Sequence, residues 1–237
     1  MKPTEYSELR FQIAAPQIAP PQIATSQRKP VPRTFYASFG KRIFDIVLAL
    51  AILPLITPII LGVWMMARRD GGPGLFVQDR VGLNGTTFKC LKIRSMVHDA
   101  DRKLTQYLDQ NPDAAAEWHI NQKLRHDPRI TAFGKFIRAT SLDELPQVFN
   151  ILKGEMSFIG PRPFMLNQEA LYRQANGTGY YQLRPGISGP WQVSGRGETS
   201  FADRADFDNE YYRNLSFRTD MKLVFQTFKV LAQRTGH

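Results

Sequence analysis

Residues 46–67 read IVLALAILPLITPIILGVWMMA, which is 22 consecutive positions without a charged side chain. At 1.5 Å per residue, a helix of this length is about 33 Å long, enough to cross the hydrocarbon core of a bilayer. A helix in the core of a soluble protein is rarely apolar on every face. We therefore expect the segment to insert into a membrane. The central helix of a soluble fold is the alternative that the pattern leaves open.

Two prolines and the flanking charges bear on how the segment inserts. Pro54 and Pro58 lie near its middle and lack the backbone N–H that a straight helix needs. Basic pairs at 41–42 and 68–69 flank both ends, so the positive-inside rule gives no direction. We predict a re-entrant helical hairpin over 35–70 that is broken near Pro54 and leaves the membrane by the face it entered. A straight, tilted transmembrane helix is the second possibility.

Asp45 lies within the first turn of this insertion. A carboxylate there is costly unless it lies at headgroup level or pairs with Arg42 or a later arginine.

The segment before the apolar run has a different composition. Residues 1–34 contain six prolines and three Gln-Ile-Ala repeats spaced five residues apart. That spacing fits neither a helix nor a strand, so we predict a flexible, Pro-rich tail. The tail has no compact apolar region followed by a small-residue cleavage site, so it is not expected to be a signal peptide.

Composition limits the class of protein. The chain has 237 residues, 43% of them hydrophobic, and a single cysteine, Cys90. These values exclude a disordered, collagenous or disulfide-built protein. The 31 Lys+Arg exceed the 21 Asp+Glu by ten. This excess predicts an anionic partner, which could be nucleic acid, an acidic membrane surface or a phosphorylated substrate.

Residues 71–237 have the pattern of a globular, water-facing domain. Asn84-Gly85 between two β-prone runs predicts a β-hairpin. Apolar spacing predicts helices over about 97–109, 113–124, 131–139 and 142–153, and a last amphipathic helix from Phe217 to Leu231. The last helix can face the core, the membrane or a second copy of the chain, so a homo-oligomer remains open. The predicted fold class is α+β, mainly helical: a monotopic membrane protein whose cytosolic catalytic domain contains a small β-hairpin.

The densest cluster of candidate residues is FIRATSLDELPQVFNILKGEMSFIGPRP, residues 136–163. Ser141 and Glu144 have the spacing of a capping box, which would place Asp143 and Glu144 in the first turn of a helix. The structural interpretation is that these carboxylates only stabilise the helix dipole. The functional interpretation is that the helix N-terminus lowers the pKa of Asp143 and keeps it ionised, ready to bind a metal or act as a nucleophile.

Basic residues accompany this cluster. Arg138 precedes Asp143 by five positions, and two prolines restrict the backbone of Arg162 in Pro-Arg-Pro. A guanidinium held in this way suits bidentate phosphate binding. Lys92 and Arg94 alternate with apolar residues as in a strand, so both would project from one face. For each of these cations a solvated surface position is the alternative.

Other patterns exclude other chemistries. The four histidines lack zinc-ligand spacing, and neither a GxGxxG nor a GxxxxGK[ST] sequence occurs. The sequence therefore does not support a zinc site, a dinucleotide-binding fold or a P-loop.

Four motifs occur in order: KRIFDIVLALAILPLITP, GPGLFVQDRVGLNGTTFKCLKIRSM, RATSLDELPQVFNILKGEMSFIGPRP and RPGISGPWQVSGR. Together they resemble the monotopic phosphoglycosyl transferases, the bacterial sugar transferases that start exopolysaccharide and glycoconjugate assembly on undecaprenyl phosphate. The resemblance covers about 39–233. Residues 1–34 lie outside it, and about 103–122 is longer than in the smallest members of the family.

The resemblance implies a mechanism. Asp143 of an Asp143–Glu144 dyad would attack the β-phosphorus of a UDP-sugar and release UMP, and undecaprenyl phosphate would then take the phosphosugar. Mg2+ would offset the diphosphate charge with Asp143 as a ligand. Glu144 is the weaker catalytic assignment, because the capping box already gives it a structural role. The cations implied to contact phosphate are Lys92, Arg138 and Arg162, and Arg184 and Arg196 are candidates for nucleotide or sugar contact.

The resemblance also implies a location and partners. The protein would lie at the cytoplasmic face of the bacterial inner membrane among membrane lipids, and its sugar would be galactose or glucose by analogy with rhizobial exopolysaccharide starters. The alternatives are a membrane-anchored adaptor that binds acidic lipids and, more remotely, a nucleic-acid binder. We expect no nucleic-acid partner, because the cations are scattered among acids and no binding motif is present.

Overall fold

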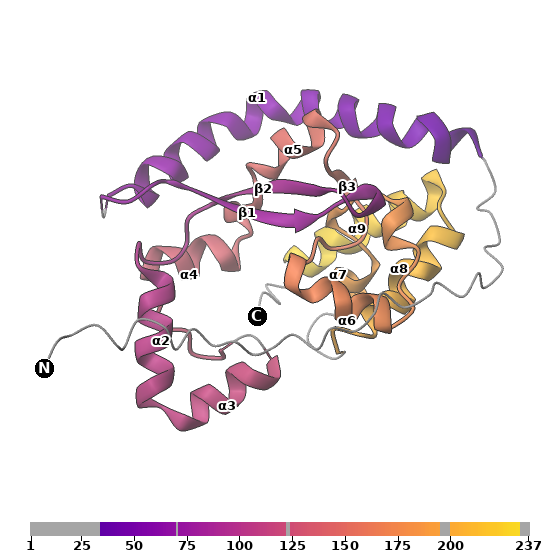
Figure 1. Ribbon diagram of the computed structural model, residues 1–237. Coiled ribbons are helices and arrows are strands. Elements are labelled where there is room, and N and C mark those ends of the chain that lie inside the picture. Colours follow the sequence, from indigo (N-terminus) through magenta and orange to yellow (C-terminus); the bar gives the residue numbers. More distant parts are fainter. Residues whose placement is uncertain (1–33, 70, 122–123, 195–199, 233–237) are drawn as a thin grey trace, which may run out of the picture. The chain divides into compact units, whose positions relative to one another are not determined.

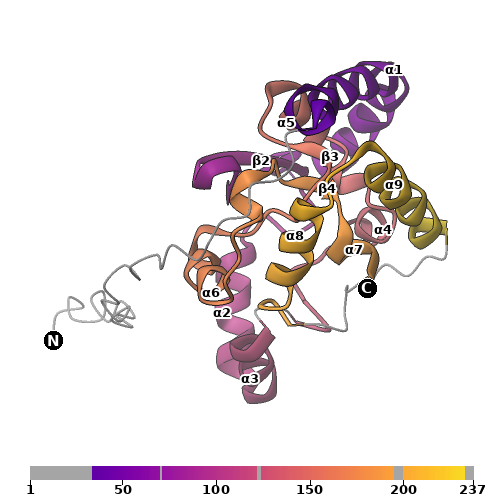
Figure 2. The same ribbon diagram turned by 90° about the vertical axis from the view of Figure 1, so that its right-hand side faces the viewer.

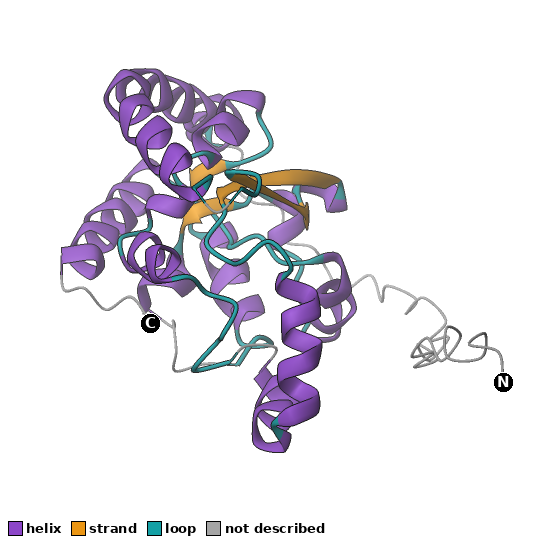
Figure 3. Ribbon diagram, turned by 90° about the vertical axis from the view of Figure 1, so that its left-hand side faces the viewer, coloured by secondary structure: helices purple, strands orange, loops and turns teal. Residues whose placement is uncertain are grey.

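The computed structural model describes residues 34–69, 71–121, 124–194 and 200–232 (Figure 1). A π-helical turn, Tyr36–Gly40, leads directly into the longest element. The helices are α1 (Lys41–Ala67), α2 (Ala100–Gln110), α3 (Pro112–Asn121), α4 (Ala132–Ala139), α5 (Gln147–Lys153), α6 (Glu169–Gln174), α7 (Pro190–Ser194), α8 (Arg204–Arg213) and α9 (Phe217–Ala232). The strands are β1 (Leu75–Val81), β2 (Thr87–Ile93), β3 (Ser157–Ile159) and β4 (Gly186–Ser188). Figure 3 shows that helices predominate and that the strands are few, as the predicted fold class requires.

Helix α1 is continuous, and both Pro54 and Pro58 lie inside it. The predicted turn near Pro54 is therefore not present in the structure. Each proline removes one helical hydrogen bond, and the Thr57 hydroxyl donates to the Leu53 carbonyl at 2.7 Å, a contact that bends helices without ending them. The result is an arched helix along one side of the domain (Figure 1).

The two long faces of α1 differ in their surroundings. One face is buried at helical spacing against β2, β3 and α5. Its buried residues are Lys41, Asp45, Ala49, Ile60, Val63 and Ala67. The opposite face exposes large apolar side chains, namely Ile43, Val47, Leu50, Leu55, Ile59, Leu61, Met65 and Met66. In the most hydrophobic 18-residue stretch of this helical segment, only 17% is buried. A core helix of a soluble fold would be mostly buried, so α1 is not one.

Both ends of α1 are bonded to the same domain. Near its start, the Lys41 ammonium pairs with Asp220 of α9 at 2.6 Å. At its end, the carbonyl of Ala67 accepts a hydrogen bond from Arg94. Figure 2, turned by 90°, also shows α1 on one side of the domain and the α2–α3 arm on the opposite side. A helix held at both ends in this way lies along the domain surface.

Asp45 has a different partner from the one that the sequence suggested. Its carboxylate Oδ1 accepts hydrogen bonds from the Ser157 hydroxyl at 2.9 Å and from the Phe158 backbone N–H at 3.1 Å. These donors, rather than an ion pair with Arg42, satisfy the buried acid. The contact also joins α1 to β3.

The predicted hairpin is confirmed. Strands β1 and β2 pair antiparallel, with Val81 opposite Thr87 at the closed end. Asn84 and Gly85 both have positive φ (57° and 77°), which is the backbone of a type I′ turn. On the other side of β2, the buried Asn150 of α5 accepts from the Leu91 N–H and donates to the Lys89 carbonyl. This side chain fixes α5 against the strand that carries Lys92.

The short parallel pair β3–β4 was not predicted from the sequence. It joins two segments that are about 30 residues apart in the chain, so no local sequence pattern predicts it. At its edge Gly160 N–H donates to the Ser188 carbonyl, and a Cβ on Gly160 would lie 2.4 Å from the Arg184 carbonyl oxygen. The close approach explains the glycine at this position.

The helices over about 97–109, 113–124 and 131–139 are confirmed within a few residues as α2, α3 and α4. The last helix is confirmed as α9, in which Leu223 is buried while Phe217, Phe225 and Phe228 are exposed. The helix expected over 142–153 is shorter: a 3-10 turn, Leu142–Glu144, precedes α5. The tail over 1–34 lies outside the described residues, except for Thr34.

Candidate functional site

Asp143 and Glu144 lie in the 3-10 turn that joins α4 to α5. Ser141, at the start of this turn, has a left-handed backbone (φ 56°), and its side chain makes no capping hydrogen bond. The predicted capping box is therefore wrong. Because the turn is too short to carry a helix dipole, both carboxylates are free of the structural task that the sequence assigned to them.

Glu144 is the acidic centre of an ion-pair cluster. Its Oε1 accepts from the Lys92 ammonium at 2.7 Å and from Arg162 Nη2 at 3.2 Å. Burial alone raises the pKa of Glu144, but Lys92 and Arg162 outweigh it and lower the pKa to about 2. Glu144 thus pairs with two cations that are 70 residues apart in the sequence.

Asp143 has a different environment from its neighbour. It is 8% exposed and takes part in none of the ion pairs formed among the described residues. Burial raises the pKa of Asp143 and the adjacent Glu144 raises it further, although Lys92 and Arg138 act in the opposite direction. The predicted lowering of this pKa is wrong, because burial and a like charge replace the expected helix N-terminus.

Arg138 approaches the same site from α4. Its Nε donates to the Ser95 hydroxyl at 2.8 Å, and its charge acts on Asp143. Arg138, Lys92 and Arg162 are therefore the cations around the Asp143–Glu144 pair. The structure brings five of the predicted residues together, and their roles in catalysis stay a prediction.

Arg94 does not share the face of Lys92 as the alternating pattern suggested. Strand β2 ends at Ile93, and the Arg94 side chain is buried and bonded to the Ala67 carbonyl of α1. Its role is to hold the end of the long helix.

Two arginines that the sequence did not single out hold the Pro161–Arg162–Pro163 segment. Arg80 of β1 donates to the Pro163 carbonyl at 3.2 Å, and Arg204 of α8 donates to the Arg162 carbonyl at 2.6 Å. Arg204 is buried, and its guanidinium lies over the rings of Trp191 and Phe201. The alternation in the predicted β1 strand could have indicated Arg80, but no local signal indicates Arg204.

The two remaining candidates do not join this cluster. Arg184 donates to the Gly154 carbonyl at 2.8 Å and lines a pocket beside the start of α1. Arg196 lies outside the described residues.

The profile of the bacterial sugar transferase family matches residues 36–234, which include every element described above. The chain belongs to the bacterial sugar transferase family.

Among curated relatives, the undecaprenyl-phosphate galactose phosphotransferase of Salmonella typhimurium is 45% identical over 199 residues, 84% of this chain and 41% of that protein. The exopolysaccharide production protein ExoY of Rhizobium meliloti is 42% identical over 198 residues, 83% of this chain and 87% of that protein. The UDP-glucose:undecaprenyl-phosphate glucose-1-phosphate transferase of Escherichia coli is 40% identical over 208 residues. The chain thus spans about two fifths of the first relatives and most of ExoY.

The resemblance to phosphoglycosyl transferases implies Mg2+ as a cofactor, so the carboxylates of the site are compared with what this ion needs. The described residues contain no cluster of three or more metal-ligating side chains. Mg2+ needs only one or two carboxylates when phosphates complete its coordination. Glu144 is occupied by two cations, so Asp143 is the carboxylate of this pair that fits a metal ligand.

Proposed function

We propose that this protein transfers a sugar-1-phosphate from a UDP-sugar to undecaprenyl phosphate and so initiates exopolysaccharide synthesis. The observation that carries the proposal is the Asp143 carboxylate, which is buried and makes no ion pair among the described residues. Lys92 and Arg138 act on it, and Arg162 is paired with the adjacent Glu144. The names of the relatives, a galactose phosphotransferase and a glucose-1-phosphate transferase, support the same reaction with galactose or glucose as the sugar.

In the first step an Asp143 oxygen attacks the β-phosphorus of the UDP-sugar. A bond forms from this oxygen to the β-phosphorus, and the bond from the β-phosphorus to the oxygen that bridges it to the α-phosphorus breaks. UMP leaves with that oxygen and its electron pair, and a phosphosugar remains on the aspartate. Lys92, Arg138 and Arg162 would neutralise the phosphate charge that otherwise repels a carboxylate nucleophile.

In the second step a phosphate oxygen of undecaprenyl phosphate attacks the same phosphorus. The Asp143–phosphorus bond breaks, the carboxylate is restored, and the product is an undecaprenyl-diphosphate-linked sugar. Glu144 would keep Lys92 and Arg162 positioned through both steps, since it is ion-paired to each of them. Mg2+, when bound, would supply charge neutralisation at the diphosphate.

The acceptor is a lipid, so the protein must work at a membrane. We propose that α1 inserts its exposed apolar face into the cytoplasmic leaflet of the inner membrane, with both ends at the cytoplasmic side. The bonds from both ends of α1 to the same domain support this re-entrant placement over a spanning helix. The arch at the two prolines would let the middle of the helix go deepest.

The chemical test measures UMP release from a panel of UDP-sugars by the purified protein in nanodiscs with Mg2+ and undecaprenyl phosphate. Asp143→Asn is expected to reduce the rate by at least about a thousandfold, whereas Asp109→Asn, at an exposed position of α2, serves as the matched control and keeps it. Intact-protein mass spectrometry of the wild type without acceptor should show one added hexose phosphate. Full activity of Asp143→Asn would refute the nucleophile, and no release with any sugar favours an adaptor.

The topology test uses Phe35→Cys and Pro73→Cys, both exposed positions near the two ends of α1. Cys90 is buried and gives little background labelling. Both new cysteines should react with an impermeant reagent only when the cytoplasmic side is accessible. Labelling from opposite sides would establish a spanning helix instead.

A further inference from the structure

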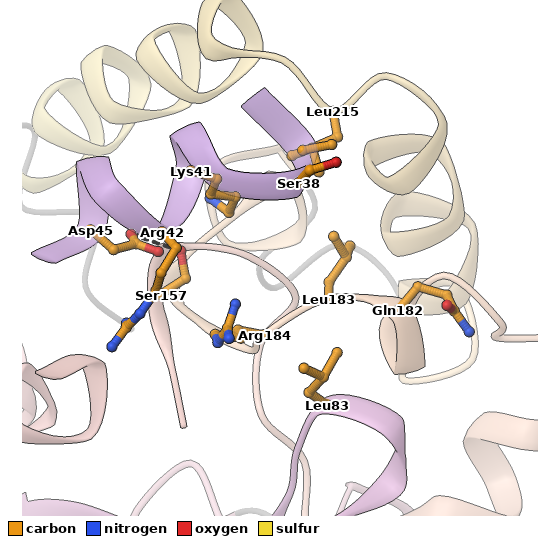
Figure 4. Close-up of a pocket in the computed structure, with 11 residues that line it drawn as sticks. Ser38, Lys41, Arg42, Asp45, Leu83, Ser157, Gln182, Leu183, Arg184 and Leu215 are labelled. Carbon is orange, nitrogen blue, oxygen red and sulfur yellow. Dashed lines mark hydrogen bonds between the residues drawn. The ribbon is translucent and has the colours of Figure 1, made fainter. Parts of the chain in front are cut away.

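A second polar site lies beside the start of α1, away from the Asp143–Glu144 pair. It is a pocket of about 90 Å³ between the first turns of α1, the hairpin tip and the segment before β4. Lys41, Arg42, Asp45 and Arg184 line its polar side, as Figure 4 shows. None of the residues around Asp143 lines it, and Asp143 and Glu144 are not among the charges that act on Arg42.

The charges in this pocket do not balance. Lys41 is paired with Asp220, and the Asp45 carboxylate is the acidic group that faces Arg42. Arg42 and Arg184 are close enough to repel each other. No carboxylate of the described chain lies within ion-pair distance of either guanidinium. After Asp45 is counted, one positive charge is left over, which favours an anion in the pocket.

The two guanidinium groups are fixed by the carbonyl end of α5. Arg42 donates to the carbonyls of Ile151 at 2.6 Å and Leu152 at 3.1 Å, and Arg184 Nε donates to the carbonyl of Gly154 at 2.8 Å. Gly154 ends α5 with φ 89°, and a Cβ there would lie 3.5 Å from Arg42 Nη2. The arginines are thus held before any ligand arrives, and both Nη atoms of Arg184 make no hydrogen bond within the described residues. A guanidinium fork with unused donors matches phosphate geometry.

The rest of the pocket is apolar. Leu83 of the hairpin tip, Leu183 and Leu215 line it opposite the cations (Figure 4). On the adjoining turns before α1, Phe35 and Phe39 are 75% and 65% exposed. Cations on one wall and leucines on the other, next to exposed phenylalanines, suit a phosphate that is attached to a hydrocarbon group.

We propose that this pocket binds the phosphate group of an anionic amphiphile, with Arg184 as its main donor and the leucine wall along the hydrocarbon. Bound there, the phosphate would neutralise the repulsion between Arg42 and Arg184 and fix the depth of the start of α1 at headgroup level. Its approach from the bilayer rests on the membrane placement proposed above. The phosphate binding itself does not rest on the proposed reaction.

Calorimetric titration of the full chain in detergent tests the proposal, with short-chain phosphatidic acid as the probe. The matched diacylglycerol, which lacks the phosphate, is expected not to bind. Arg184→Gln should weaken binding of phosphatidic acid about tenfold or more, whereas Arg213→Gln, at an exposed arginine of α8, should not. Equal binding by these two variants would overturn the proposal.

A second pair of variants leaves the arginines intact. Leu83→Glu places a negative charge on the wall opposite Arg184, and Leu83→Gln is its neutral match. Phosphatidic acid should bind Leu83→Gln several-fold more tightly than Leu83→Glu, and equal binding by both would contradict an anion in this pocket. Thermal unfolding of each variant shows that it is folded under the titration conditions.

Inorganic phosphate distinguishes the source of the ligand. If millimolar phosphate displaces phosphatidic acid, the pocket recognises the phosphate group alone. If it does not, the pocket also requires the hydrocarbon part of the lipid. Asp143→Asn is expected to bind phosphatidic acid like the wild type. Binding without UMP release would refute the proposed reaction but not this site, and UMP release without binding would refute this site but not the reaction.

Discussion

The buried ion pair between Lys41 of α1 and Asp220 of α9 is a point at which the long helix can be detached. Asp220 is fully buried and accepts hydrogen bonds from the Lys41 ammonium at 2.6 Å, from the Tyr36 hydroxyl at 2.5 Å and from the Tyr211 hydroxyl at 2.6 Å. Asp220→Asn keeps the size of the side chain but leaves a buried lysine without its counter-charge. Breaking a buried pair in this way costs about 3–5 kcal/mol of unfolding free energy.

The assay is thermal unfolding of the purified protein in detergent. For a chain of this length, about 3–5 kcal/mol lowers the Tm by about 6–20 °C. The matched control is Asp79→Asn, which removes the exposed pair with Lys89 on the hairpin and should cost about 0–1 kcal/mol. Adding Lys41→Met to Asp220→Asn removes the unpaired charge and should restore most of the loss.

Equal losses of Tm in Asp220→Asn and Asp79→Asn would contradict a stabilising role of the buried pair. A lower Tm in the Lys41→Met, Asp220→Asn double variant than in Asp220→Asn would contradict it as well. Either result would mean that the start of α1 does not depend on this pair.

The remaining predictions concern the pH dependence, the Arg162 segment and backbone packing. Burial raises the pKa of Asp208 to about 7, so the folded state holds a proton that the unfolded state releases. The Tm should therefore fall as the pH rises from about 4 to 7, and it should fall less in Asp208→Asn. Arg204→Gln removes the donor to the Arg162 carbonyl and should slow UMP release about tenfold. It should lower kcat more than the control Arg213→Gln, which changes an exposed arginine. An unchanged kcat in Arg204→Gln would contradict a positioning role. Glu144→Gln keeps the shape but loses the charge that holds Lys92 and Arg162, and should slow UMP release by about ten- to a hundredfold; wild-type rates would exclude this role. Gly134→Ala would place a Cβ against the Ser95 carbonyl and should lower the Tm. Gly62→Ala should not lower it, because the space around Gly62 is open. Equal Tm values would show that the backbone near Ser95 moves to make room for the new Cβ.

Sequence patterns correctly predicted the features that depend on residues close together in the chain. The apolar run from 46 to 67, the Asn84-Gly85 turn and the amphipathic α9 all depend on side chains close together in the chain, and the structure contains each of them. The capping box at Ser141 failed although its spacing was correct. A capping box needs a continuing helix, and the left-handed Ser141 followed by Pro146 makes a short turn instead.

The candidate site shows the same division. Asp143, Glu144 and the flanking Lys92, Arg138 and Arg162 could be named from residue type, spacing and resemblance to a family. The direction of the Asp143 pKa shift could not, because it depends on burial and on which cations reach Glu144 rather than Asp143. The role of Arg204 could not be predicted, because its contact with Arg162 joins positions 42 residues apart.

The amino-acid sequence was enough to predict that a basic domain adjoins a long apolar helix, and that carboxylates and cations suited to phosphate chemistry occur in that domain. The folded structure was needed to establish that α1 is continuous and bonded at both ends to one domain. It also showed that Asp143, unlike Glu144, makes no ion pair among the described residues, and that Arg184 lies with Arg42 in a separate pocket. The physical reason is that charge pairing and burial depend on distances between segments remote in the chain. Hydrophobic periodicity and turn propensity are properties of neighbouring residues alone.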